Sequence, residues 1–472
     1  MHNFKNINEL KSFYNKFSGE NLSSIEDYIK INYPEISIST NKGVVGQILE
    51  ALIGNSPNSN PNPDVENLNI ELKVLPLRKV SNQIQPKERS KIKSINYNKI
   101  VNEQWTKSSV RNKLKKILFL MYEHPIGKSY KDWKELVFKG TLLYVLSEEN
   151  ENTVRNDWNK IQAKVVSGLA NSLSEGDSKI LGACTSGTGK LIKYGNNYFA
   201  KQRSYSLKHS YLKVFFNRKK KNLKYSSLKI DNKINPENYI LGIINSKLHG
   251  RYLKDVVLEY NLDFSQKSKS SFRLLINKIF KIDENRRILE LDENDVDIKT
   301  IPVNNNLIPW EAMSFPKFSL VDILNENWDG ENEPEFKSMI SQNFIFIPIV
   351  KEKEKYFSDN KTKYRYKNWK TWKIGKSKFW KADSYNLSII KKEWEKMKSI
   401  VQGGVKVTNV KYGKKTRQEN NLLKSSCTKI IHVRPHARDS NDIDIPYFNY
   451  SNTKISWQSF WLNKSYIKEI IS

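Results

Sequence analysis

Hydrophobic and polar residues alternate one by one in the stretch 70–74, and this pattern predicts a β-strand. Ile70, Leu72 and Val74 are apolar, whereas the two residues between them, Glu71 and Lys73, are charged. A period of two places the apolar residues on one face of a half-buried strand and the charged residues on the other. Glu71 and Lys73 therefore point the same way, about 6 to 7 Å apart.

A helix is predicted just before this strand, between Gly43 and Gly54. Apolar residues occupy positions 44, 45, 48, 49 and 52, which is the spacing of one helix face, and Gly54 provides a C-terminal stop. Glu50 is the one acidic residue of this helix. It is either a solvent-facing helix residue or a member of a functional site shared with the strand that follows.

The predicted strand also carries a candidate metal site. Asp64 follows a Pro- and Asn-rich turn, residues 57–63, and a tight bend there can bring it back beside Glu71. Two converging carboxylates suit a hard cation such as Mg²⁺, with Mn²⁺ as a substitute, and the backbone carbonyl of Leu72 is a third oxygen ligand. Such an ion can hold a phosphodiester, while Lys73 positions or deprotonates the attacking water. The alternative is an ordinary pair of charges on a solvated strand face, because Glu-x-Lys is a common tripeptide.

The charge of the chain points to a polyanionic partner. Its 472 residues include 80 Lys and Arg against 50 Asp and Glu, which gives a net charge of +30 at pH 7. A field of this size favours nucleic acid or an anionic membrane surface. The longest apolar runs, such as 344–350, are far shorter than the ~20 residues that span a bilayer, so nucleic acid is favoured. Two cysteines and a polar start at residues 1–21 indicate a cytoplasmic protein without a disulfide framework.

A second set of candidate residues follows, in which long polar side chains are mixed with aromatic ones. A helix beginning at Asp157 is followed by a strand, by a Gly/Ser/Thr loop at 184–190 and by a polar segment at 201–211. Arg and Gln are suited to reading base edges in the major groove, and Lys, Ser and Thr to binding phosphates. The alternative for 201–211 is an amphipathic element with Tyr205 and Leu207 in the core. The predicted DNA contacts are Thr185, Ser186, Lys190, Gln202, Arg203, Ser206 and Lys208.

The spacing of the charged residues resembles that of a known family, the MutH-like endonucleases of the restriction-nuclease fold. These carry a Gly-rich helix with a glutamate, followed by Asp, Glu and Lys at fixed distances. Here the distances between successive members are 14, 7 and 2 residues, and the run 43–47 supplies the glycines. The resemblance implies an α/β (α+β) mixed-sheet fold of the PD-(D/E)xK type and a metal-dependent DNA endonuclease. The implied catalytic residues are Glu50, Asp64, Glu71 and Lys73, and the implied metal ligands are Asp64, Glu71 and the Leu72 carbonyl.

The resemblance extends into the predicted DNA-reading part of the chain. Trp158, Glu175 and the run 203–208 follow in family order. In three segments, 87–89, 95–97 and 202–208, the chain looks closer to the two-domain type II restriction enzymes that cut at GATC, the staphylococcal Sau-three-A type. Ser206 stands where the repair nickase of the family has a tyrosine used in sensing adenine methylation, and Ser186 where it has a lysine aimed at the target site. These departures leave methylation sensing and part of the base readout open.

The chain also resembles itself, which predicts a duplicated fold. Four landmarks of the first half recur in the same order in the second half, at offsets of 226, 236, 250 and 255 residues. Four such matches in one order are hard to ascribe to chance. The recurring stretches are 71–76, 157–168, 180–187 and 205–211, matched by 297–302, 393–404, 430–437 and 460–466.

The second copy lacks part of the chemistry of the first. Ile276 occupies the position of Glu50, so the helix acid is missing. Glu290 and Asp297 occupy the positions of the two metal-binding acids, and metal binding by this pair is left open. A module of this kind is interpreted as a regulatory DNA-binding domain. Its predicted contacts with effector DNA are Arg434, His436, Trp461 and Asn463.

Together these features predict a two-domain nuclease. Residues 1–220 form the catalytic domain, 221–235 a basic polar linker and 236–472 a degenerate pseudo-nuclease domain. The predicted function is Mg²⁺-dependent type II restriction, in which both strands of double-stranded DNA are cut at a short palindrome, GATC, to leave 5′-phosphates. DNA bound to the second domain acts as an allosteric effector. Dimerisation on DNA and a companion DNA methyltransferase in the host are expected as well.

Two alternatives to restriction are kept. A MutH-type mismatch-repair nicking endonuclease shares the chemistry, but a nickase recruited by repair partners does not need a fused second module. A non-catalytic, sequence-specific DNA-binding protein is the alternative from another class. The intact set of four charged residues in the first copy argues against it, because only chemistry requires all four together.

Overall fold

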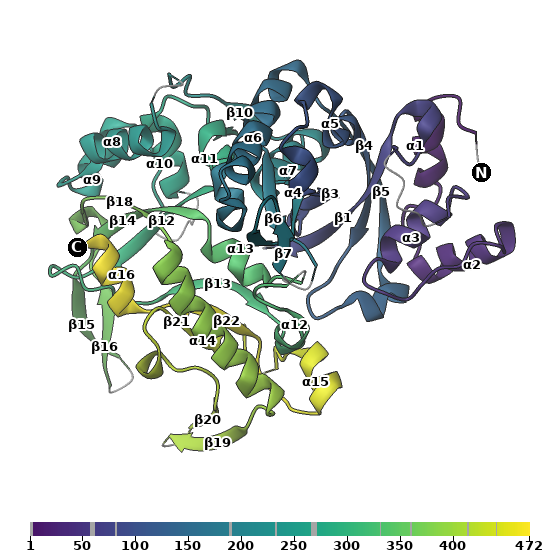
Figure 1. The fold of residues 1–472 in the computed structure, drawn as a ribbon. Helices are drawn as coiled ribbons and strands as arrows, with labels where there is room; N and C mark the ends of the chain where they lie inside the picture. Colours follow the sequence, from purple (N-terminus) through teal and green to yellow (C-terminus); the bar gives the residue numbers. More distant parts are fainter. Residues whose placement is uncertain are drawn as a thin grey trace. The chain divides into compact units, whose positions relative to one another are not determined.

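The chain is divided into two compact units. Figure 1 shows the helices and strands that make them up. The computed structural model describes residues 3–56, 62–80, 83–187, 191–231, 234–265, 271–330, 332–358, 361–412, 415–439 and 441–472. The first unit comprises Met1–Lys221 together with Asn325–Glu335, and the second comprises Asn222–Leu324 together with Phe336–Ser472. A short segment from the second half of the chain therefore belongs to the first unit.

The first unit contains a four-stranded mixed sheet with the strand order β2-β1-β4-β5. Its central strands, β1 and β4, run parallel, with Glu71 opposite Ile117, and the outer strands are antiparallel to their neighbours. This mixed α/β sheet agrees with the predicted fold class. The strands are β1 (Glu71–Val80), β2 (Gln83–Pro86), β4 (Lys116–Glu123) and β5 (Val137–Val145).

Strand β1 is buried on both faces at its start, where the alternation predicted a strand with one solvated face. Glu71 and Leu72 are 0% and 1% exposed. Ile70 and Leu72 belong to one hydrophobic core, whereas Leu75 and Leu77 belong to a second core on the opposite face. The prediction was wrong on this point because β1 lies inside a sheet that is covered on both sides. Glu71 is therefore a carboxylate held in the interior.

A smaller antiparallel sheet of the same unit has the order β3-β9-β6. Tyr205 and Leu207 are 4% and 0% exposed, so they lie in the core as the amphipathic interpretation predicts. A long helix, α6, is fixed to this sheet by Asp157, whose carboxylate accepts hydrogen bonds from three successive backbone N–H groups at 179–181. The elements are β3 (Ser90–Ser94), β6 (Leu181–Thr185), β9 (Arg203–Leu207), the hairpin β7 (Leu191–Tyr194) and β8 (Tyr198–Lys201), and α6 (Glu148–Val166).

The remaining helices of the first unit include α3, which forms where the apolar spacing predicts a helix. Gly54 follows it with φ +80°, a left-handed conformation that glycine adopts without strain. The α-helices are α1 (Ile7–Asn15), α2 (Leu22–Asn32), α3 (Val44–Ala51), α4 (Tyr97–Ile100), α5 (Ser109–Leu114) and α7 (His209–Lys220). The 3₁₀ turns are η1 (Glu66–Leu68), η2 (Trp105–Lys107), η3 (Tyr130–Glu135), η4 (Ala170–Ser172) and η5 (Glu175–Asp177).

The second unit has two comparable sheets. In the first, β12 and β14 run parallel, and β17 and β18 are both antiparallel to β14. In the second, the order is β13-β22-β21, and all pairs are antiparallel. The strands are β12 (Val296–Val303), β14 (Asn343–Val350), β17 (Lys373–Ile374), β18 (Lys378–Lys381), β13 (Met313–Phe318), β21 (Ile431–Pro435) and β22 (Gln458–Leu462).

Three two-stranded ribbons and several helices complete the second unit. The ribbons are β10 (Lys224–Ser226) with β11 (Arg286–Ile288), β15 (Lys353–Ser358) with β16 (Lys361–Tyr366), and β19 (Val407–Tyr412) with β20 (Lys415–Asn420). Strand β10 lies within the stretch 221–235 that was predicted to be a linker. The helices are α8 (Pro236–Leu248), α9 (Leu253–Glu259), α10 (Ser271–Ile279), α11 (Leu289–Glu293), α12 (Leu320–Asn325), α13 (Glu335–Ile340), α14 (Ser384–Gln402), α15 (Ile445–Ser451) and α16 (Lys464–Ile471), with the 3₁₀ turns η6 (Trp369–Thr371) and η7 (Ser425–Cys427).

The helices and the two cysteines agree with the apolar runs and cysteine content of the sequence. Within the described residues, none of the helices combines the length and the apolar character that crossing a bilayer requires. Cys184 is buried and Cys427 is exposed, and both are free thiols.

Candidate active site

Glu50 lies on α3 with its carboxyl group largely withdrawn from solvent. Burial and, secondarily, the charge of Asp64 raise the pKa of Glu50 to about 7. Helix α3 is anchored from the other side, because the buried Tyr14 hydroxyl donates a 2.8 Å hydrogen bond to the carbonyl oxygen of Leu49. Glu50 is therefore not a solvent-facing helix residue. It lies within electrostatic range of the acids on β1.

Asp64 is brought back to the start of β1 by a tight local bend. Val65 and Ile70 exchange backbone hydrogen bonds of 2.9 and 3.2 Å, and Asn69 between them has a left-handed φ of +53°. As a result the Asp64 carboxylate accepts a 2.7 Å hydrogen bond from the backbone N–H of Leu72. The predicted return of Asp64 beside the strand agrees with this geometry, whereas residues 57–61 of the predicted turn lie outside the described residues.

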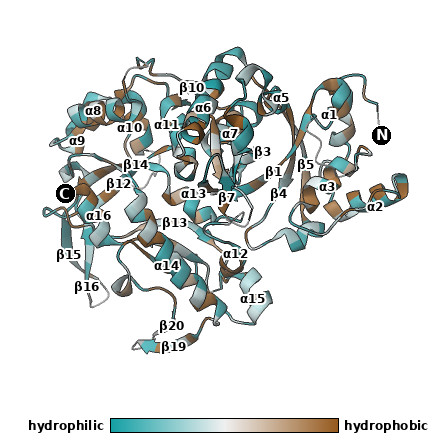
Figure 2. Cartoon of the chain, in the orientation of Figure 1, coloured by the Kyte–Doolittle hydropathy of each residue, from teal (hydrophilic) through white to brown (hydrophobic). Residues whose placement is uncertain are grey.

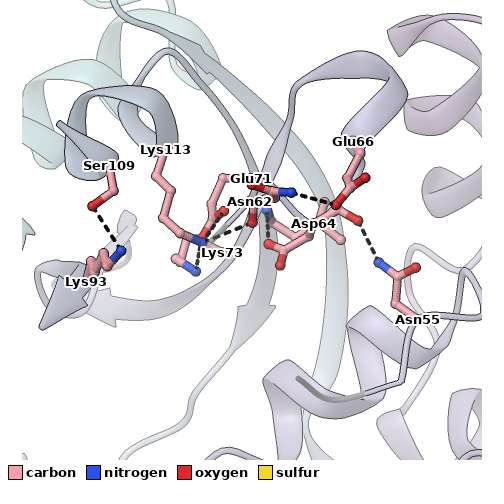
Figure 3. A network of polar contacts seen from close by, with 10 residues as sticks. Asn55, Asn62, Asp64, Glu66, Glu71, Lys73, Lys93, Ser109 and Lys113 are labelled. Atoms are coloured by element: carbon pink, nitrogen blue, oxygen red, sulfur yellow. Dashed lines mark hydrogen bonds and ion pairs between the residues drawn. The ribbon is translucent and has the colours of Figure 1, made fainter. Parts of the chain in front are cut away.

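Asp64 is also influenced by its acidic neighbour. Burial and then the charge of Glu71 raise the pKa of Asp64 above its usual range. Asn55 donates a 2.9 Å hydrogen bond from its side chain to the Asp64 carbonyl and so fixes the backbone at this point (Figure 3). Three acids from α3, the bend and β1 therefore form one electrostatically coupled group.

Glu71 is bound by two lysines. The Nζ atom of Lys73 lies 2.6 Å from one carboxylate oxygen, and the Nζ atom of Lys113 lies 2.8 Å from each of the two oxygens. Figure 3 shows both lysines directed at Glu71, with Asp64 beside them. Lys113 lies on α5, 42 positions after Glu71 in the sequence, and its side chain is only 8% exposed.

Lys113 is the residue of this site that the sequence interpretation missed. The available signal was its place between Val110 and Leu114, both buried, on the apolar face of α5. A lysine at a core position of a helix is rare unless it is paired. A further lysine, Lys93, lies nearby and donates a 2.9 Å hydrogen bond to Ser109. Burial and the charge of Lys113 lower the pKa of Lys93.

The donor set of this site fits a hard divalent cation. Asp64 and Glu71 offer carboxylate oxygens, and their mutual repulsion is of the kind that a cation relieves. Among the residues that the structure describes, no group of three or more His, Cys, Asp or Glu side chains is arranged to enclose a metal ion as it stands. Glu71 is instead neutralised by the two ammonium groups of Lys73 and Lys113.

The predicted DNA-contact residues are distributed over β6 and β9. Thr185 and Arg203 are directly opposite each other, and the guanidinium of Arg203 donates a 2.9 Å hydrogen bond to the Thr185 hydroxyl. Ser186 is joined to the next position, Gln202, by a 3.1 Å backbone hydrogen bond. These four residues therefore form one continuous strip. Lys190 lies outside the described residues.

Several of these side chains have partners within the protein. The Gln202 amide donates to the carbonyl oxygens of Ile95 and Arg203, at 2.9 and 2.8 Å. Ser206 is fully buried, and its hydroxyl donates a 2.8 Å hydrogen bond to Glu175. Lys208 donates a 2.7 Å hydrogen bond to the Ser178 carbonyl. Of these groups, the Ser206 hydroxyl would have to leave its buried position to contact DNA.

Carboxylates from the segment Asn325–Glu335 also reach this part of the first unit. Glu333 forms a 2.8 Å ion pair with Arg89 and accepts a 3.3 Å hydrogen bond from the Thr185 hydroxyl. Glu335 forms an ion pair with Arg78. Arg89, which also pairs with Glu175, is a basic residue of this surface that the contact prediction left out.

In the second unit, three of the four predicted effector contacts form one cluster. The Arg434 guanidinium lies 5.0 Å from the centre of the Trp461 ring, and the His436 ring lies 5.8 Å from the same ring in a tilted arrangement. His436 also shares a 2.7 Å hydrogen bond with Ser459. Asn463 is different, because it is only 2% exposed and its amide donates a 2.9 Å hydrogen bond to the backbone carbonyl of Thr428.

The acids of the second unit have other surroundings than those of the first. Glu290 accepts hydrogen bonds from the Ser227 hydroxyl and the Leu228 N–H at 2.6 and 2.7 Å. Asp297 pairs with Lys299 at 2.7 Å, but both side chains are about half exposed. Ile276, at the position of the helix acid, is buried and lines a cavity of about 360 Å³.

The chain is similar in sequence to DNA endonucleases of mismatch repair and of restriction. Residues 53–157 match the family model described as the DNA mismatch repair enzyme MutH. The type II restriction enzyme Sau3AI of Staphylococcus aureus is 27% identical over 479 aligned residues, which cover 92% of this chain and 93% of that enzyme. The resemblance inferred from the residue spacing is therefore confirmed.

The mismatch-repair relatives cover less of the chain. The DNA mismatch repair protein MutH of Actinobacillus pleuropneumoniae serotype 3 is 27% identical over 35% of this chain and 70% of its own length. The corresponding protein of Vibrio vulnificus (strain YJ016) is 28% identical over the same shares. Asp64, Glu71, Lys73 and Lys113 all lie within the matched region 53–157, whereas Glu50 lies just before it.

Proposed function

We propose that this chain is a DNA endonuclease of the type II restriction kind, which hydrolyses phosphodiester bonds in double-stranded DNA. One observation carries the proposal: Glu71, a fully buried carboxylate, is held by Lys73 and Lys113 beside a second acid, Asp64. Buried, coupled charges of this kind are costly to a fold and are concentrated at functional sites. The similarity to a restriction enzyme over 92% of the chain supports the same conclusion.

Asp64 and Glu71, with the Leu72 carbonyl, would hold a divalent cation, which we propose to be Mg²⁺ in the cell and replaceable by Mn²⁺. When bound, the cation supplies Lewis-acid stabilisation of the phosphate and of the leaving oxygen. Lys73 is exposed enough to reach a water molecule and positions it or accepts its proton. Lys113 holds Glu71 in place and adds positive charge at the phosphate. Glu50, with a pKa of about 7, can hold or release a proton beside this group.

We further propose that DNA is read by the strip on β6 and β9. Arg203 and Thr185 are the residues of this strip whose side chains face each other across the two strands. An arginine can bind the two acceptors of guanine in the major groove, which gives specificity for one base pair. GATC is the proposed site, and this choice rests on the resemblance to the GATC-cutting group.

The second unit is proposed to be a degenerate copy of the first that binds effector DNA. In both units a parallel strand pair is accompanied by a three-stranded antiparallel sheet, β3-β9-β6 in one and β13-β22-β21 in the other. Glu393 accepts hydrogen bonds from three successive backbone N–H groups at 429–431, as Asp157 does at 179–181. Two carboxylates with the same unusual role, 236 positions apart, favour descent from one module.

Restriction is favoured over mismatch-repair nicking because the similarity to the restriction enzyme includes the second unit, whereas the MutH relatives match only about a third of the chain. A non-catalytic DNA-binding protein would not need the buried acids and lysines of the first unit. Dimerisation on DNA and a companion methyltransferase that protects host DNA belong to the same proposal.

The proposal is tested by cleavage. The purified chain is incubated with Mg²⁺ and plasmid DNA of known sequence, and the cut ends are sequenced. Double-strand breaks at one short palindrome with 5′-phosphates are expected. Single-strand nicks alone would favour the repair activity, and binding without cleavage would favour the non-catalytic alternative.

A further inference from the structure

The ribbon formed by β15 and β16 is exposed along most of its length, and among its described residues Tyr366, at the base, packs against the hydrophobic core of the unit. Its two strands pair antiparallel from Lys353 opposite Tyr366 to Ser358 opposite Lys361, and no third strand joins them among the described residues. Every described side chain of the ribbon is exposed or half exposed, including Phe357 at 73% and Tyr364 at 59%. Figure 1 shows the ribbon projecting from its unit, and Figure 2 shows its largely hydrophilic colouring.

The two faces of this ribbon differ in their aromatic and acidic residues. Residues directly opposite each other share a face, and successive residues alternate between the faces. One face, called here the ribbon face, carries lysines and aromatic rings and has no carboxylate. Its members are Lys353, Lys355, Phe357, Thr362, Tyr364 and Tyr366. The opposite face contains Glu354, which forms a 2.7 Å ion pair with Arg365.

The root of the ribbon is anchored to its unit by contacts between lysines and aromatic rings. Lys353 lies 4.3 Å above the Trp310 ring, and Lys351 lies 3.7 Å above the Trp372 ring. The indole N–H of Trp310 donates a 3.0 Å hydrogen bond to the Lys351 carbonyl. Cation–π contacts and a backbone hydrogen bond therefore anchor the end of the ribbon that joins the unit.

We propose that the ribbon face binds duplex DNA, with the ribbon lying in a groove as a second gripping element of the effector module. This rests on the proposed function. The major groove, about 12 Å wide, accommodates a two-stranded ribbon. Lys355, exposed on the ribbon face, would pair with a phosphate, and the exposed Phe357 would provide an apolar wedge against the bases. Exposed rings between lysines are unfavourable in water and favourable against stacked bases.

The test compares matched substitutions on the two faces of one ribbon in the full-length chain. All variants carry Asp64→Ala to prevent cleavage, and binding to a short labelled duplex containing GATC is measured by fluorescence anisotropy. Lys355→Glu on the ribbon face should weaken binding about tenfold, whereas Lys363→Glu, the same charge change on the opposite face, should change it less than about threefold. Phe357→Ser should also weaken binding about tenfold, and its control Tyr356→Ser should not.

Each other result overturns the inference. If Lys355→Glu and Lys363→Glu weakened DNA binding equally, the net charge of the ribbon and not its face would determine the affinity. If Lys355→Glu or Phe357→Ser left the affinity for the duplex unchanged, the ribbon face would not be a DNA-binding surface. If Lys355→Glu abolished binding to phosphatidylserine vesicles while DNA binding was unchanged, the partner would be a lipid surface. The unaltered chain, with Asp64 in place, is assayed in parallel for plasmid cleavage. If this chain is folded but neither binds nor cuts DNA, the proposed function itself has failed, and the result is distinguished from a failure of the ribbon proposal alone.

Discussion

Replacing Lys113 with methionine isolates the ion pair that the sequence did not reveal. The substitution keeps the length of the side chain and removes its charge, which leaves the fully buried Glu71 with Lys73 as its remaining cation at 2.6 Å. Removing one partner of a buried pair typically costs about 3 to 5 kcal/mol. Because Lys73 still compensates part of the charge, we expect a loss below this range, about 2 to 3 kcal/mol, in the free energy of unfolding of the first unit.

Mg²⁺ should reverse part of this loss. A divalent cation bound to Glu71 and Asp64 replaces the missing positive charge, and any ligand that binds only the folded state raises its stability. The added stabilisation by Mg²⁺ should therefore be larger for Lys113→Met than for the unaltered chain. Glu71→Gln introduced together with Lys113→Met should restore most of the stability without Mg²⁺, because no buried charge is then left unpaired.

The assay is urea unfolding of the full-length chain followed by tryptophan fluorescence, with and without Mg²⁺. Lys93→Met serves as the matched control, because Lys93 belongs to the same cationic cluster but bonds to a serine hydroxyl instead of an acid. We expect it to cost less than about 1 kcal/mol. Equal effects of the two substitutions, or a Lys113→Met variant as stable as the unaltered chain, would refute the assignment of Lys113 as the partner of Glu71.

Three further predictions concern other parts of the molecule. The folded pKa of Glu50, about 7, is above the value of 4.5 for a free glutamate, so ionisation of Glu50 should lower stability progressively as pH rises from 4.5 through 7. In EDTA, Glu50→Gln should reduce this decline and be more stable than the unaltered chain at pH 8 by up to about 3 kcal/mol, whereas an unchanged decline would contradict the burial of the Glu50 carboxyl. Arg203→Ala should weaken binding to GATC duplexes by about 1 to 3 kcal/mol but leave binding to random DNA nearly unchanged, whereas equal losses would make Arg203 a phosphate contact. A plasmid with two recognition sites should be cut faster than a plasmid with one, and a short duplex added in trans should speed up cleavage of the one-site plasmid. Arg434→Ala should remove this effect of the added duplex, and equal rates on both plasmids would rule out an allosteric role for the second unit.

The parts of the site that depend on local sequence were predictable. The alternation at 70–74 located β1, the apolar spacing located α3, and the short distance from Asp64 to Glu71 allowed the bend to be foreseen. These features are set by a few neighbouring residues, whose periodicity and turn chemistry are visible in the sequence. The burial of Glu71 was not foreseen, because it depends on two cores that cover the sheet from opposite sides.

The parts that depend on distant packing were not predictable. Lys113 reaches Glu71 only because α5 packs beside the sheet. Its place on the apolar face of α5 indicates that it has a buried partner, but the sequence does not identify that partner as Glu71. The internal bonds of Ser206 and Gln202 likewise depend on partners far along the chain. The inclusion of Asn325–Glu335 in the first unit has no local signal at all, since it is decided by long-range contacts.

The most direct test of the central claim is plasmid cleavage by the unaltered chain and by its Asp64→Ala variant in parallel. Both proteins are first shown to be folded by circular dichroism and to bind the same duplex with affinities within a few-fold of each other. The account predicts Mg²⁺-dependent double-strand cuts by the unaltered chain at one short palindrome, and none by Asp64→Ala, because loss of a metal ligand removes stabilisation that exists only in the transition state. Cleavage by the variant at a rate near that of the unaltered chain would place the active site elsewhere and contradict the account.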